Sequence, residues 1–146
     1  MPGILWSCVA RNGNILVEAG ADEGEGEVTG LAQKLMKQKP TPGWEFQRSR
    51  RKGLRGLKFH VYDDGDGCDE GRLIWVFACV ADKSLEDSQQ KSFLEKLVYL
   101  TEPLRLDDYL WREGGLLACQ GTFGPMLFQR MEQGELKHVS FFLSSS

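Results

Sequence analysis

The chain has 146 residues, of which 41% are hydrophobic and 27% are charged, and its formal net charge is −3. This composition predicts one globular domain that buries about 70% of its unfolded surface, and the negative charge argues against general affinity for nucleic acid. Because no apolar run reaches the roughly 20 residues of a membrane span, and residues 1–13 do not resemble a signal peptide, we expect a cytoplasmic protein. Peripheral association with endomembranes is left open.

The first third of the chain predicts a hairpin followed by a helix. Residues 4–10, ILWSCVA, and the run ILVEAGA from residue 15 flank Asn12-Gly13, and Asn-Gly between two β-prone runs is a strong hairpin signal. Residues 27–38 then change period, with apolar side chains spaced along one helical face: Val28, Leu31, Ala32, Leu35 and Met36. The proline- and glycine-rich residues 39–43 end this helix.

Three further strands follow, and they differ in pattern. Residues 44–50, WEFQRSR, and residues 57–62, LKFHVY, alternate between apolar and polar, which predicts strands with one face toward water. Residues 73–81, LIWVFACVA, are apolar throughout, as are residues 4–10. Strands without a polar face must be covered on both sides, so we place these two side by side in the centre. The first hairpin then extends one side of the sheet, and the three-strand meander extends the other.

The last part of the chain predicts two helices. The first covers about residues 84–101, with an apolar stripe of Phe93, Leu94, Leu97 and Val98. We expect Ser84 and Asp87 to cap it and Pro103 to mark its end. The second starts at Thr122, takes Pro125 in its first turn, and buries the apolar side chains Phe123, Met126, Leu127 and Met131. Residues 102–121 allow no assignment.

These elements predict an α+β fold: a five-stranded, mostly antiparallel sheet with one helix on one face and two on the other. Their order, and the stretches ILWSCVARNGNILVEA, LKFHVY with LIWVFACVAD, SFLEKL and LACQGTFGPMLFQRM, resemble the longin domain. This profilin-like domain is the N-terminal regulatory domain of longin-type R-SNAREs. The resemblance covers residues 3–138, so we expect one domain over residues 1–138 and a tail over residues 139–146. The residues after Glu132 lack the heptads of a SNARE motif, so we do not expect the chain to join a fusion bundle.

The resemblance implies a non-catalytic protein-interaction module of vesicle trafficking. In longin SNAREs a groove between the first helix and the third strand receives a SNARE helix or a partner segment. The corresponding side chains here are Leu31, Leu35 and Met36 with Trp44 and Phe46. The implied partners are a SNARE helix, a tether or a small GTPase. The alternative for these five side chains is that they only pack on one another.

A basic stretch, RSRRKGLRGLK, lies at residues 48–58, between two alternating strands. The simplest interpretation is a hairpin tip that charge keeps soluble and unpaired. A second is an accessory contact of Arg50, Arg51, Lys52 and Arg55 with an anionic membrane or a protein. A nucleic-acid site is the weakest interpretation, because interleaved aromatic residues are missing.

Patterns typical of catalysis or of bound ions are incomplete. GEGEVTG at residues 24–30 lacks dinucleotide-loop spacing, and the acidic run at residues 63–71 fails the EF-hand pattern. His60 is expected on the half-exposed face of a strand, and the cysteines are not spaced as metal ligands. We therefore expect no catalytic site, cofactor or metal. Two alternatives stay open: a small cytosolic enzyme with an unrecognised site, and an assembly subunit that pairs with its own copy.

Overall fold

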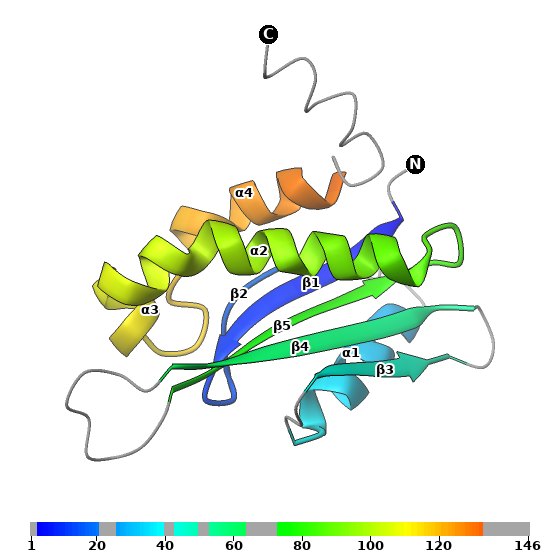
Figure 1. Ribbon diagram of the computed structural model, residues 1–146, viewed down its shortest axis with the longest axis horizontal. Coiled ribbons are helices and arrows are strands. Elements are labelled where there is room, and N and C mark those ends of the chain that lie inside the picture. The colour runs from blue at the N-terminus through cyan, green and yellow to red at the C-terminus, as the bar shows by residue number, and fades with distance from the viewer. Residues whose placement is uncertain (1–2, 21–25, 40–42, 50–52, 64–72, 133–146) are drawn as a thin grey trace, which may run out of the picture.

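The computed structural model describes residues 3–20, 26–39, 43–49, 53–63 and 73–132. Its elements, in chain order, are β1 (Ile4–Arg11), β2 (Asn14–Ala19), α1 (Glu27–Lys37), β3 (Trp44–Arg48), β4 (Arg55–Asp63), β5 (Leu73–Ala81), α2 (Asp87–Asp107), α3 (Tyr109–Glu113) and α4 (Gln120–Glu132). The strands form one sheet, with α1 behind it and the other helices in front (Figure 1). No helix of the described part is long and apolar enough to cross a bilayer.

The strand order is β2-β1-β5-β4-β3, and every neighbouring pair is antiparallel. The predicted α+β fold and the central position of β1 and β5 are confirmed. β1 and β5 lie in the centre for the reason that the sequence indicated: both strands are apolar on both faces, and each face must be covered. Val9 and Phe77, for example, pair across the two strands, and neither is exposed to solvent.

Each face of the sheet has its own apolar core. The larger core joins the sheet to α2, α3 and α4, and its largest members include Trp75, Phe77, Leu94, Trp111 and Leu127. The smaller core joins the sheet to α1 and includes Trp6, Cys8, Leu31, Leu35 and Val80. The sheet is therefore the middle layer of three.

The alternation of β4 predicted a polar face open to water, but Lys58 and His60, which lie on that face, are buried. Lys58 is 1% exposed and His60 is 7% exposed. Both lie on the face that α1 covers, opposite Leu57, which packs in the larger core. Period-two alternation shows which residues share a face, but it does not show whether a helix covers that face.

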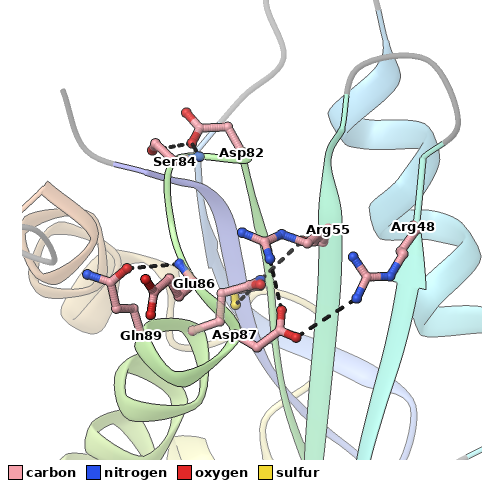
Figure 2. Close-up of polar contacts among 9 residues, drawn as sticks. Arg48, Arg55, Asp82, Ser84, Glu86, Asp87 and Gln89 are labelled. Atoms are coloured by element: carbon pink, nitrogen blue, oxygen red, sulfur yellow. Dashed lines mark hydrogen bonds and ion pairs between the residues drawn. The ribbon is translucent and has the colours of Figure 1, made fainter.

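The limits of α2 also differ from the prediction. The helix begins at Asp87 with a capping box between Glu86 and Gln89, while Ser84 instead donates a hydrogen bond to Asp82 (Figure 2). It continues through Pro103 to Asp107. Proline removes the hydrogen bond to the carbonyl four residues earlier, which belongs to Tyr99. Because Tyr99 is 80% exposed and Pro103 is exposed too, this carbonyl lies on the side of the helix that water reaches.

The unassigned residues 102–121 contain the end of α2, the short helix α3 and the connection to α4. The last helix begins at Gln120, two residues before the predicted start, so Pro125 lies in its second turn. Its buried stripe consists of Phe123, Leu127 and Met131, spaced by four residues. Met126 was predicted to be buried and is 44% exposed, because it lies beside this narrow stripe.

Candidate functional site at the open edge of the sheet

A five-stranded open sheet has two edges, and here β2 is the sealed one. Two backbone amides of the segment before α4 donate hydrogen bonds to β2: Leu117 to the carbonyl of Ile15 at 2.7 Å, and Cys119 to that of Leu16 at 3.0 Å. The side chain of Gln120 pairs with both backbone groups of Glu18, at 2.7 and 2.9 Å. This edge is therefore occupied by the chain itself, which prevents pairing with another strand.

A buried arginine holds the sealing segment in place. Arg11, at the end of β1, donates one hydrogen bond from each terminal nitrogen to the carbonyl oxygens of Trp111 and Gly114, both at 2.6 Å. Arg11 is 9% exposed, so these charge-assisted bonds are shielded from water. The segment also takes an unusual backbone conformation, since Leu117 has a φ of +57°.

The opposite edge, formed by β3, is open. Within the described residues, β3 pairs only with β4. Beyond the end of β3, the amide of Ser49 donates to the carbonyl of Leu54 at 2.9 Å. Because hydrogen-bonded and non-hydrogen-bonded pairs alternate in an antiparallel ladder, the backbone groups of Trp44, Phe46 and Arg48 point away from β4. The amide and carbonyl groups of these three residues therefore face outward from this edge of the sheet.

Aromatic and basic side chains border this open edge on the α2 side. The ring of Trp44 stacks on Phe59 with centroids 4.4 Å apart. The ammonium of Lys91, on α2, lies 5.7 Å from the Trp44 ring and 5.6 Å from the Phe46 ring. Phe46 is 36% exposed, and the side chain of Arg48 is 62% exposed. We call Trp44, Phe46, Arg48 and Lys91 the β3 edge site.

The groove predicted from the sequence does not form as one surface. Leu31 and Leu35 are buried in the core beneath α1, and Met36 packs against that core with its sulfur 3.9 Å from that of Cys8. Trp44 and Phe46 lie on the opposite face of the sheet, where Lys91 of α2 meets them.

The reason for this error is the register of the meander. Glu45 and Gln47 pair with Lys58 and Gly56, and a side chain at Gly56 would meet Leu35 of α1. The face of β3 toward α1 is therefore polar, and the aromatic face is turned toward α2. The sequence identified Trp44 and Phe46 but missed Arg48 and Lys91, since nothing in the pattern of α2 distinguishes Lys91 from the other lysine of this helix, Lys96.

The structure also differs from the basic hairpin tip that the sequence predicted. Arg50, Arg51 and Lys52 lie outside the described residues. Arg55 belongs to β4, not to the tip, and its guanidinium lies 3.0 Å from the carboxylate of Asp87 at the start of α2 (Figure 2). Only 17% of its side chain is exposed, so Arg55 is not placed to contact an anionic surface.

The face of β4 toward α1 holds a buried lysine. Lys58 donates hydrogen bonds to the carbonyl oxygens of Leu35 at 2.9 Å and Gln38 at 2.6 Å, and its ammonium lies 3.8 Å from the carboxylate of Glu45. Burial lowers the pKa of Lys58, and Glu45 opposes this effect. The lysine thus occupies the C-terminal carbonyls of α1, where a cation is favoured.

His60 and the described cysteines are poorly suited to catalysis. Burial lowers the pKa of His60, and its Nδ1 atom has no hydrogen-bond partner among the described residues. Burial raises the pKa of Cys79 to about 12 and that of Cys119 to about 11, and it raises the pKa of Cys8 as well. A thiol with such a pKa is rarely a thiolate at neutral pH, and the thiolate is the nucleophile.

No cluster of three His, Cys, Asp or Glu side chains suited to a metal occurs in the part of the chain that the structure describes. The acidic run after Asp63, the start of GEGEVTG, Cys68 and His138 lie outside that part. No model of a known protein family matches the sequence, and no curated protein matches it. The interpretation of the β3 edge site therefore depends on its geometry and chemistry.

Proposed function

We propose that this protein is a longin-like protein-interaction module of vesicle trafficking, and that it binds an extended segment of a partner along the outer edge of β3. The observation that supports the proposal is the difference between the two edges of the sheet. The chain seals β2 with backbone and side-chain hydrogen bonds, whereas the outward backbone groups of β3 have no strand partner among the described residues. An open edge beside the exposed ring of Phe46 suits strand addition.

The geometry of β3 defines how a partner segment would bind. Its backbone would exchange hydrogen bonds with Trp44, Phe46 and Arg48, each with a net value of about 1 kcal/mol. An apolar side chain would cover Phe46, and acidic side chains would meet Arg48 and Lys91. The sequence resemblance to longin domains points to SNAREs, tethers and small GTPases as the partner classes, on the cytoplasmic side of endomembranes. No chemical step is required of the module.

A proline at position 46 tests this binding mode. The amide of Phe46 faces the open edge, so Phe46→Pro removes no hydrogen bond to β4 but blocks strand addition. We expect the wild-type chain to recover a SNARE, tether or small GTPase from cell extract, and the variant to lose that protein. A matched control is Phe128→Ala, which removes an aromatic side chain on α4 that is 49% exposed.

The outcomes separate the proposal from its alternatives. Recovery of a trafficking protein that survives Phe46→Pro would reject the β3 edge site but not the trafficking role. Failure to recover any of the three partner classes would contradict the trafficking role. Turnover of a metabolite that depends on His60 would instead favour an enzyme.

A further inference from the structure

The open edge of β3 is complementary to itself. We infer that two copies of this chain pair through β3, antiparallel, about a twofold axis that passes beside Phe46. In this arrangement Phe46 lies opposite Phe46 of the second copy, and Trp44 lies opposite Arg48 of the second copy. The five strands of each copy then form one continuous sheet, whose two outer edges are the β2 strands that the chain itself seals.

The backbone selects this register. Trp44, Phe46 and Arg48 are the residues of β3 whose backbone groups point outward. When the twofold axis passes beside Phe46, each of these three residues lies opposite an outward-pointing residue of the second copy. Each such pair exchanges two hydrogen bonds. A shift by two residues leaves one of the three without a partner, and a shift by one residue opposes groups that point inward. The register on Phe46 therefore makes the most backbone hydrogen bonds.

The side chains favour the same register. The outward residues place their side chains on the α2 side, where Phe46 is 36% exposed and Arg48 is 62% exposed at its side chain. Two Phe46 rings would meet as a cross-strand aromatic pair. The guanidinium of Arg48 would lie beside the indole of Trp44 from the second copy, and a cation next to the face of an indole is favourable. No like charges face each other directly along this side of the ladder.

Self-pairing would also regulate the proposed partner site, a consequence that rests on the proposed function. The second copy would occupy the donors and acceptors that a partner segment needs, so a copy is either paired with itself or open to the partner. The pairing itself does not depend on the identity of any partner.

Analytical ultracentrifugation tests the pairing. A five-residue edge buries little area, so we expect a reversible dimer whose fraction rises between about 10 µM and 1 mM. Phe46→Pro should reduce the dimer fraction at least tenfold at the highest concentration, while Phe128→Ala should leave it unchanged. A chain that stays monomeric throughout, or a dimer that survives Phe46→Pro, overturns the inference.

Disulfide cross-linking tests the register. Phe46→Cys, in a background with Cys68→Ser, places two thiols in one cross-strand pair about 5.5 Å apart at their Cα atoms, within reach of a disulfide. Gln47→Cys in the same background is the matched control, because two such thiols would be diagonal neighbours about 7–8 Å apart. We expect oxidised dimers from Phe46→Cys alone. Linkage through Gln47→Cys instead, or from neither variant, contradicts the register.

The two proposals fail separately. Loss of trafficking partners with Phe46→Pro from a chain that is monomeric at every concentration would reject self-pairing and keep the proposed function. A dimer that cross-links at position 46, from a chain that recovers none of the three partner classes, would keep self-pairing and reject the proposed function.

Discussion

Lys58 of β4 donates a hydrogen bond to the carbonyl oxygen of Leu35 across 2.9 Å, so a buried charge in the sheet fastens the last turn of α1. A second bond from the same ammonium reaches Gln38. Replacing Lys58 by methionine keeps most of the apolar volume but leaves both carbonyls without this donor. We expect Lys58→Met to lower the free energy of unfolding by about 2–4 kcal/mol, measured by urea denaturation with tryptophan fluorescence.

The control for this prediction is Lys34→Met on the exposed face of α1. Its side chain is exposed, so a change within about 0.5 kcal/mol is expected. Equal effects of the two substitutions would show that the hydrogen bonds of Lys58 do not stabilise α1.

His60 should make the protein less stable in mild acid. Burial is the main cause that lowers its pKa below 6.5, the neighbouring charge of Lys58 adds to that effect, and Glu45 opposes it. In the unfolded chain the imidazole keeps its ordinary pKa, so below about pH 6.5 the unfolded state binds the proton more readily. The free energy of unfolding therefore falls as the pH falls, by at most about 1.4 kcal/mol per pH unit for one group. Above that pH the neutral imidazole contributes its full stability.

Urea denaturation at several values between pH 7.5 and pH 5.5 measures this slope. His60→Phe removes the titrating group and keeps a ring of similar size, so the variant should lose less stability than the wild type over the same range. Parallel curves for the two proteins would assign the acid sensitivity to other groups.

The strand order could be predicted because two runs, residues 4–10 and 73–81, are apolar at nearly every position and so had to lie in the centre. The covers of the outer strands could not be predicted in the same way. Alternation correctly placed Trp44 and Phe46 on the same face of the strand. Because helices lie on both sides of the sheet, however, the pattern does not show whether α1 or α2 covers that face. Lys58 was assigned to water for the same reason, since a long side chain that ends on helix carbonyls looks like any exposed lysine in sequence.

Local sequence signals also gave wrong predictions, or none, where a tertiary contact or water decides the structure. Pro103 predicted the end of a helix, yet α2 continues because the lost hydrogen bond lies on the exposed side. The sealing of β2 left no local signal, since it depends on Arg11 and Gln120, which are 100 or more residues from their partners.

Asp87 joins α2 to the β3–β4 hairpin through two arginines of very different exposure (Figure 2). Arg55 lies 3.0 Å from its carboxylate with a side chain that is 17% exposed, whereas Arg48 lies 3.9 Å away and is 62% exposed. A double-mutant cycle between Arg55→Met and Asp87→Asn should give a coupling of about 0.5–1.5 kcal/mol. The same cycle with Arg48→Met should give less than about 0.3 kcal/mol, because water screens exposed ion pairs. Equal couplings would contradict this ranking.

Arg11 donates hydrogen bonds to the segment that seals β2, so its removal should expose a second edge of the sheet. Arg11→Met leaves the carbonyls of Trp111 and Gly114 without their donors, for which we expect a loss of about 2–4 kcal/mol in the free energy of unfolding. Hydrogen exchange gives the local readout: the amides of Leu117 and Cys119, which donate to β2, should lose more protection than the amides of β5.

Arg130→Met is the matched control, since Arg130 lies on the exposed face of α4 and should leave both measurements unchanged. Uniform loss of protection throughout the sheet would show that Arg11 stabilises the whole fold rather than the seal. A selective loss at Leu117 and Cys119 has a further consequence, because a freed β2 edge offers a second site for strand pairing. Association of Arg11→Met should then persist when Phe46→Pro is added, unlike the association through β3.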